Sequence, residues 1–314
     1  MQHPPRHIYI YSPAGAVRDK AAFQRGVRWL QGQGHAVEID PAALTCHQRF
    51  AGDDAARLAA IARAAASGAD VALISRGGYG LTRLLDALPY RAIAKAAERG
   101  THFVGFSDFT ALQLAVYTRT GTRTWAGPTL GADFGAAAGP DEITQACFDD
   151  LLGGQGEGTG WRIAARDAQW SEGFPARAIH GATLWGGNLS VLVSLLGTPY
   201  FPQPAQIDRG VLFLEDVNEH PYRIERMFDQ LRHAGLLARQ RGILLGSFAG
   251  CDALAHDRGF SMRTVIARLR GLIRAPVLTG LPLGHTPRKV LLPVGARVDV
   301  TLDERDVLVL WGHP

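Results

Sequence analysis

The first half of this chain alternates between short apolar runs and segments with the spacing of an amphipathic helix. The apolar runs span residues 7–11, 35–39, 70–74 and 102–106, and we expect each of them to form a strand. The segments between them place apolar side chains three and four residues apart, which predicts helices. Repeated strand–helix units fold as a parallel sheet whose carboxyl edge carries the ligand-binding loops. The alternation therefore predicts an α/β fold with its function at that edge.

With 314 residues, the chain is long for a single core, so we expect two domains. Residues 153–160 contain five glycines in eight positions and are the best candidate for a linker. We therefore place an N-terminal domain at residues 1–152 and a C-terminal domain at residues 161–314. The C-terminal domain is predicted to be an α/β domain with a mixed sheet, with strands at 178–183, 211–214, 242–245, 276–278, 289–292, 297–301 and 307–311.

Composition excludes several classes of protein. No run of 18 apolar residues is present, and the N-terminus lacks a basic segment followed by an apolar one, so we expect neither a membrane span nor a secretory signal. The three cysteines form no CxxC pair, which is typical of a cytoplasmic protein. A net charge of +4 without a basic run argues against nucleic-acid binding. No HExxH sequence or comparable cluster suggests a metal.

Ser107 stands where a predicted strand changes directly into a predicted helix. A serine on such a turn projects its hydroxyl above the sheet edge, and Gly105 would relieve the crowding there. The hydrolase elbow is Gly-x-Ser-x-Gly, but the last position here is Phe109, so the motif is incomplete. The alternative is that Ser107 or Asp108 caps the helix, which is the commoner role of these residue types.

A glycine-rich loop, Arg76–Gly80, follows the third predicted strand. A dinucleotide fingerprint would need another glycine where Arg83 stands, and no Gly-Lys-Ser/Thr sequence occurs, so a nucleotide site is not expected. A tight connecting turn is one alternative. The other is a set of main-chain N–H groups that stabilise an oxyanion, provided that Ser107 lies on the neighbouring strand.

A serine nucleophile needs a base and an orienting acid. His285 follows an apolar run in a Gly- and Pro-rich loop, where an imidazole can project into a cleft. Glu215 ends a very apolar strand, where an unpaired carboxylate would be costly. Asp216 and Glu219 are rivals for the acid, although either could instead cap the helix that begins near Pro221.

Several motifs in order along the chain resemble the LD-carboxypeptidases, a family that includes the muramoyltetrapeptide carboxypeptidases and whose relatives are the microcin immunity peptidases. The resemblance covers nearly the whole chain from about Pro13. Its motifs are RGGYG with Arg83-Leu84-Leu85, GFSDFTA at 105–111, LWGGNL at 184–189, LGTP at 196–199, LFLEDVNEHPYRIER at 212–226, and Gly284-His285 followed by Leu292-Pro293-Val294-Gly295.

The resemblance implies an N-terminal flavodoxin-like domain, a C-terminal β-rich α/β domain, and an active site between them. It implies a serine peptidase in which Ser107 is the nucleophile, Glu215 the orienting acid and His285 the general base. The main-chain N–H groups of Gly78 and Asp108 would form the oxyanion hole. This selects Glu215 over its two rivals.

By the same resemblance, Arg76, Gly77 and Tyr79 would contact the substrate, with no metal or organic cofactor. The expected substrate is a murein tetrapeptide that loses its terminal D-Ala during cytoplasmic peptidoglycan recycling, and the expected assembly is a homodimer. The alternatives are a peptidase for a peptidyl-nucleotide antibiotic and a non-catalytic two-domain binding protein. Many relatives have Tyr at Phe106 and His-Gly-Pro at 126–128; the second difference favours the muropeptide branch.

Overall fold

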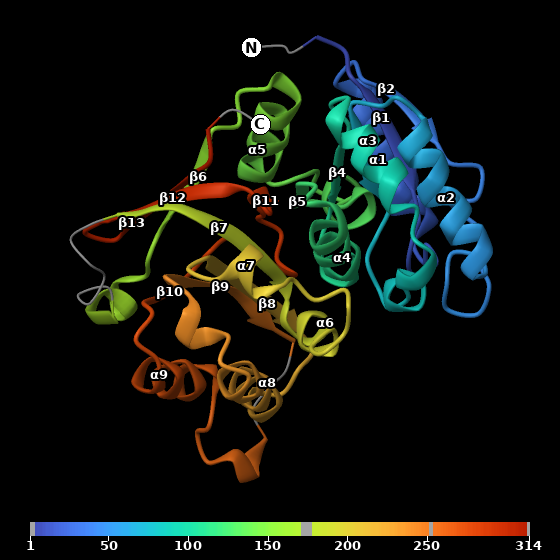
Figure 1. The fold of residues 1–314 in the computed structure, drawn as a ribbon. Coiled ribbons are helices and arrows are strands. Elements are labelled where there is room, and N and C mark those ends of the chain that lie inside the picture. The colour runs from blue at the N-terminus through green and yellow to red at the C-terminus, as the bar shows by residue number, and fades with distance from the viewer. Residues whose placement is uncertain (1–3, 171–177, 251–253, 313–314) are drawn as a thin grey trace.

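The computed structural model describes residues 4–170, 178–250 and 254–312. It contains two mixed sheets, each flanked by helices (Figure 1). The first sheet has the order β11-β5-β4-β3-β1-β2, in which all strands but β11 are parallel. Its strands are β1 (His7–Tyr11), β2 (Ala36–Ile39), β3 (Val71–Ile74), β4 (His102–Gly105), β5 (Thr124–Ala126) and β11 (Leu292–Val294). From β2 to β5 this is the flavodoxin-like strand order, as expected.

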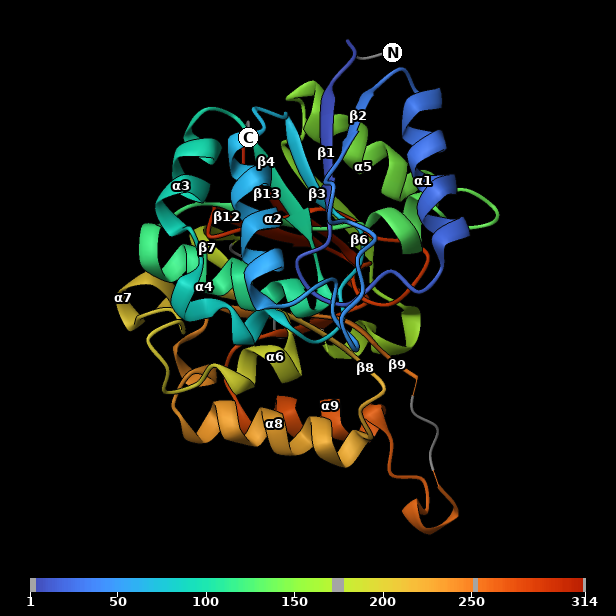
Figure 2. The same ribbon diagram turned by 90° about the vertical axis from the view of Figure 1, so that its right-hand side faces the viewer.

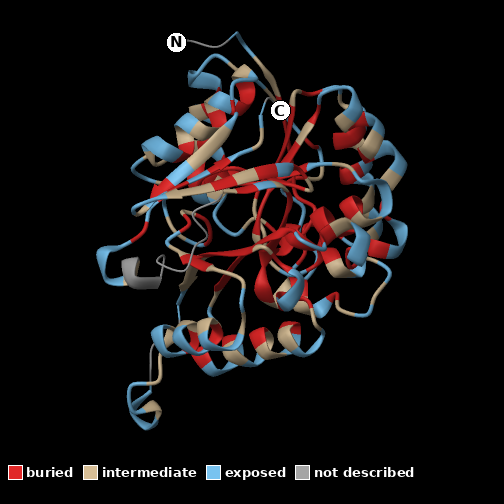
Figure 3. Ribbon diagram, turned by 60° about the vertical axis from the view of Figure 1, so that its left-hand side comes forward, coloured by how far each residue is buried: buried red, intermediate tan, exposed pale blue. Residues whose placement is uncertain are grey.

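Helices cover both faces of the first sheet because its strands are apolar on both sides. Ile8 and Ile10 face one core with α1 and α5, whereas Tyr9 and Tyr11 face the other with α2, α3 and α4. The helices are α1 (Lys20–Gly32), α2 (Asp54–Ala66), α3 (Tyr90–Glu98), α4 (Thr110–Thr120) and α5 (Glu142–Gly153). Figure 3 shows the buried residues gathered along the strands and the exposed residues on the outer faces of the helices.

The second sheet has the order β10-β9-β8-β7-β12-β13-β6, which confirms a mixed sheet. Strands β7 to β10 run parallel, and β12, β13 and β6 extend the sheet in antiparallel fashion. The strands are β6 (Gly158–Arg162), β7 (Ile179–Asn188), β8 (Val211–Val217), β9 (Gly242–Ala249), β10 (Val277–Thr279), β12 (Arg297–Asp303) and β13 (Asp306–Leu310). The helices are α6 (Leu189–Ser194), α7 (Pro204–Ile207), α8 (Pro221–His233) and α9 (Met262–Leu272). Figures 1 and 2 both show α8 and α9 side by side beneath this sheet.

The two halves share one continuous apolar core that includes residues of α4 and of strands β7 to β9. Main-chain and side-chain hydrogen bonds also join them: Thr110 Oγ1 accepts the N–H of Asn188 at 2.9 Å, and Thr118 donates to the carbonyl of Tyr200 at 3.1 Å. Helix α4, which begins three residues after Ser107, is thus packed against the C-terminal half. This packing fixes the two sides of the site relative to each other.

One predicted strand is wrong. Residues 289–292 were expected to form a strand of the C-terminal sheet, but the strand is β11 (Leu292–Val294), and it pairs with β5 in the first sheet (Figure 1). Lys289 instead makes a buried ion pair with Asp133. The predicted linker at 153–160 overlaps β6, which begins at Gly158. The domain boundaries at residues 152 and 161 remain a prediction. No helix of the described residues is long and apolar enough to cross a bilayer.

Candidate active site

Ser107 lies just beyond the carboxyl end of β4, in a backbone conformation that is rare for a residue with a side chain. Its φ is +66°, in the left-handed region. Strain of this kind concentrates at functional sites, and it is the geometry of a nucleophile elbow. Two glycines make room for the turn: a Cβ on Gly105 would lie 2.6 Å from Ile74 Cδ1, and one on Gly77 would lie 3.0 Å from the Ser107 Cβ. The expected role of Gly105 in relieving crowding is confirmed.

The helix-cap alternative is wrong for both Ser107 and Asp108. The chain makes a 3-10 turn over Ser107–Phe109 before α4, and neither element has a side-chain cap. The Asp108 carboxylate instead accepts the main-chain N–H of Leu81 at 2.8 Å. Burial raises the pKa of Asp108 to about 6, although the N–H groups of Leu81 and Gly80 oppose the rise. Asp108 therefore ties the end of the glycine loop to the serine turn.

The Arg76–Gly80 loop lies against Ser107 because β3 and β4 are neighbouring parallel strands, as the sequence required. Gly77 packs on Ser107, and Gly78 has a φ of +93° that favours glycine. The buried Arg57 guanidinium donates to the carbonyl of Gly80 at 2.9 Å, which anchors the far end of the loop. The structure brings the loop and the serine together, and the oxyanion role of the Gly78 and Asp108 N–H groups remains a prediction.

On the opposite side, Glu215 and His285 form a pair. Nδ1 of His285 lies 3.1 Å from Oε2 of Glu215, whose side chain is only 1% exposed. Gly284 permits this approach, since a Cβ there would lie 3.2 Å from Glu215 Oε2 and its φ is +126°. With the proton on Nδ1 donated to the carboxylate, Nε2 is left as the basic nitrogen. The ring of Phe106, the residue before Ser107, is 4.9 Å from the His285 ring, which places the imidazole beside the serine turn.

Neither rival acid is the hydrogen-bond partner of His285, which pairs with Glu215. The Asp216 carboxylate accepts the N–H of Ser190 at 2.8 Å, and Glu219 pairs with Arg223 one helical turn away. Neither caps α8, since its cap is His220. Of the three carboxylates, Glu215 is the one that bonds to the imidazole.

Asn188 is a site residue that sequence reasoning missed. Its amide Nδ2 donates to Oε1 of Glu215 and to Oδ1 of Asp216, both at 3.1 Å, while its Oδ1 caps α6 by accepting the N–H of Val191. Burial, reinforced by the charge of Glu215, raises the pKa of Asp216. The sequence signal was an asparagine directly before a helix and after Gly-Gly, which is a capping pattern.

A buried ion pair joins the His285 loop to the N-terminal half of the chain. Lys289 Nζ lies 2.6 Å from Asp133 Oδ1, with side chains 3% and 1% exposed. The main-chain N–H of Lys289 donates to Thr144 Oγ1 at 2.7 Å, and its ammonium also donates to the carbonyl of Thr286. Because Thr286 is adjacent to His285, this pair fixes the loop that carries the imidazole.

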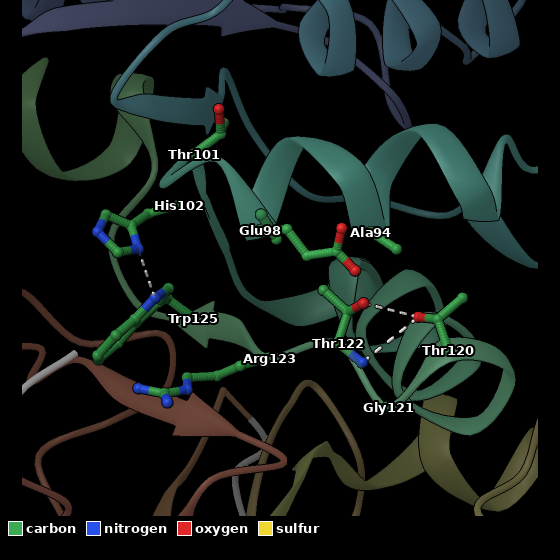
Figure 4. Close-up of a pocket in the computed structure, with 10 residues that line it drawn as sticks. Ala94, Glu98, Thr101, His102, Thr120, Gly121, Thr122, Arg123 and Trp125 are labelled. Atoms are coloured by element: carbon green, nitrogen blue, oxygen red, sulfur yellow. Dashed lines mark hydrogen bonds between the residues drawn. The ribbon is translucent and has the colours of Figure 1, made fainter.

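Of two pockets in the structure, one lies beside the candidate site and the other lies away from it. A pocket of about 500 Å³ between the loop at 79–86 and α6 is lined by Tyr79 and Asp108, which places Tyr79, 48% exposed, beside the site. The pocket in Figure 4 is lined by Trp125 of β5 and by His102 at the amino end of β4, the opposite end of that strand from Ser107. Within the described ranges, no group of His, Cys, Asp or Glu could hold a metal ion.

Comparison with known proteins gives a consistent result. Residues 8–127 match the LD-carboxypeptidase N-terminal domain, and residues 181–300 match the LD-carboxypeptidase C-terminal domain. A crystal structure of muramoyltetrapeptide carboxypeptidase from Oxalobacter formigenes is 34% identical, with a TM-score of 0.84 over 98% of this chain and 99% of that one. A probable murein peptide carboxypeptidase of Bacillus subtilis is 30% identical over 97% of this chain and 92% of its own length.

A more distant relative is the microcin C7 self-immunity protein of Escherichia coli, which is 26% identical over 74% of this chain and 71% of its own length. The two domain matches and the relatives that align along nearly the whole chain agree on one family. The protein is a carboxypeptidase and belongs to the LD-carboxypeptidase family.

Proposed function

We propose that this carboxypeptidase removes the terminal D-Ala from murein tetrapeptides, with Ser107 as nucleophile, His285 as general base and Glu215 as orienting acid. The observation that carries the proposal is the 3.1 Å contact between His285 Nδ1 and Glu215 Oε2, beside a serine in the left-handed conformation of an elbow. The relatives named above for murein peptides support the choice of substrate.

The proposed reaction uses only side chains and main-chain groups of this chain. Nε2 of His285 takes the Ser107 proton as Oγ attacks the carbonyl that links the third residue to D-Ala. The N–H groups of Gly78 and Asp108 stabilise the resulting oxyanion. The imidazolium then gives its proton to the amine of D-Ala, which leaves. Water, activated by His285, hydrolyses the ester and releases the tripeptide.

The test is to incubate the purified protein with a murein tetrapeptide and follow the tripeptide by mass spectrometry. We expect Ser107→Ala to lower turnover by about 10⁴-fold or more, because the nucleophile is lost. Ser67→Ala, at the distant end of α2, is the matched control and should keep full turnover. Turnover by Ser107→Ala within a few-fold of the wild type would rule out Ser107 as the nucleophile.

The same assay separates this proposal from the alternative of a peptidyl-nucleotide substrate. The likeness to the microcin immunity protein is more distant than the likeness to the murein enzymes, so we expect the tetrapeptide to be cut in preference to an aminoacyl-nucleotide analogue. We also propose that the reaction belongs to cytoplasmic peptidoglycan recycling and that the enzyme is a homodimer. Sedimentation of the purified protein tests the second point.

A further inference from the structure

Three arginines from separate loops converge at the carboxyl edge of the first sheet. Arg18 follows β1, Arg49 lies between β2 and α2, and Arg76 follows β3. Because carboxyl ends of parallel strands share one edge, these loops lie on the same side of the sheet as Ser107. Neither Arg18 nor Arg49 belongs to any motif that the sequence analysis singled out.

Hydrogen bonds hold these loops together. Arg76 Nη1 donates to the carbonyl of Ala16 at 2.9 Å, and the N–H of Ala16 donates to the carbonyl of Arg49 at 3.0 Å. The Arg49 guanidinium lies over the ring of Tyr79, 5.5 Å from its centre. The loops therefore form one unit with the glycine loop.

The positive charge of this cluster is not balanced by ion pairs. Within the described part of the chain, no carboxylate lies within ion-pair distance of Arg18, Arg49 or Arg76. The neighbouring carboxylates have other partners, since Asp19 faces Arg25 and Asp54 pairs with Arg57 and Arg83. Burial and the positive charges of Arg18 and Arg49 lower the pKa of Arg76. Like charges gathered in this way repel one another, and a bound anion would relieve that repulsion.

Of the three arginines, Arg76 lies next to the reacting atoms. Arg76 directly precedes Gly77, which packs on Ser107, and a Cβ on Gly78 would lie 3.3 Å from Arg76 Nη2. In a C-terminal peptide bond, one nitrogen and one Cα separate the scissile carbonyl from the terminal carboxylate, a span of about 4 Å. A cation that binds the carboxylate must therefore lie close to the nucleophile and the oxyanion hole, as Arg76 does.

We propose that Arg76, assisted by Arg18 and Arg49, binds the terminal carboxylate of the leaving residue and so restricts the enzyme to a free C-terminus. The proposal rests on the proposed function and names the substrate group that this part of the site recognises. Guanidinium groups suit the task because they pair with carboxylates in bidentate, charge-assisted hydrogen bonds. Recognition of the carboxylate by these arginines accounts for exopeptidase specificity.

The first experiment compares the tetrapeptide free acid with its C-terminal amide on the wild-type enzyme. We expect kcat/KM for the amide to be lower by about 100-fold or more, because the charge that the arginines bind is missing. Equal cleavage of acid and amide would contradict the carboxylate site and leave the proposed function standing. Cleavage of neither would contradict the proposed function, and the carboxylate site with it.

The second experiment assigns the effect to the arginines. Arg49→Gln and Arg18→Gln should each lower kcat/KM for the acid by about tenfold, and Arg76→Lys by more, with little change for the amide. Arg166→Gln, at a side chain 83% exposed in the C-terminal half, is the matched control and should change neither value. Equal losses on acid and amide would mean that the arginines have a structural role and would overturn the proposal. If a variant does not fold, the comparison on the wild type decides alone.

Discussion

The two sides of the candidate site are built in different ways. On the N-terminal side, backbone conformation positions the serine: Ser107 has a positive φ, and Gly77 and Gly105 leave room for its turn. On the C-terminal side, a chain of side-chain hydrogen bonds runs from Asp216 through Asn188 and Glu215 to His285. The first side depends on shape and the second on buried charge, so substitutions on the two sides should fail in different ways.

The largest loss of activity in this comparison is expected at Glu215, on the C-terminal side that depends on buried charge. Glu215→Gln keeps the shape of the side chain but removes its charge, so the imidazolium that forms in the reaction is no longer stabilised. We expect kcat to fall by about 10³- to 10⁴-fold with the fold unchanged, measured with the tetrapeptide and by circular dichroism. In a Ser107→Ala background the same substitution should cost almost nothing further, because the triad acts as a unit. Additive losses would show that Glu215 and Ser107 act separately.

The buried pair that joins the two sides comes next. Lys289→Met leaves the Asp133 carboxylate buried without its cation, and we expect a loss of about 3–5 kcal/mol of stability by urea unfolding. Adding Asp133→Asn should restore part of this loss, because the uncompensated charge is gone. A double variant that is no more stable than Lys289→Met would contradict the buried-charge explanation.

The smallest effect concerns Asp108, which belongs to the shape-dependent side. Its folded pKa of about 6 lies above the unfolded value of about 3.9, so the folded protein binds the proton more tightly. The stability from this group is present at low pH and is lost as the pH rises to about 6. Relative to Asp108→Asn, the wild type should therefore lose about 3 kcal/mol between pH 3.5 and pH 7. Urea unfolding at the two pH values measures the difference, and an equal pH slope for both proteins would contradict the raised pKa.

The sequence predicted the N-terminal side better because its signals are local. The strands at 7–11 and 70–74 follow from neighbouring residues, and the structure confirms both. The neighbouring positions of the Ser107 turn and the glycine loop follow from β3 and β4 being adjacent in a parallel sheet. The π-helical turn at Leu130–Phe134, which supplies Asp133, has no such signal and was missed.

Long-range pairing was the part that local patterns do not determine. Strand β11 is only three residues long and pairs with β5, which is more than 160 residues earlier, so no local pattern marks it. The local residue pattern likewise left Asp216 and Glu219 as rivals of Glu215 for the acid until the family resemblance selected Glu215. Arg18 and Arg49 stand on exposed loops, where charged residues are ordinary. Arg18 and Arg49 can be recognised as part of a cluster with Arg76 only once the fold shows that their three loops lie together.

The most direct test of the central claim, that Ser107 forms the covalent intermediate, is rapid quenching of the wild-type enzyme with a tetrapeptide. The quenched protein is digested and its peptides are analysed by mass spectrometry. We predict that the peptide containing Ser107 carries the mass of the acyl tripeptide, and that Glu215→Gln reduces the rate at which this mass appears. Acylation of a different residue would contradict the account. So would the absence of any acylated peptide when the enzyme turns over rapidly and the reaction is trapped under conditions that slow deacylation.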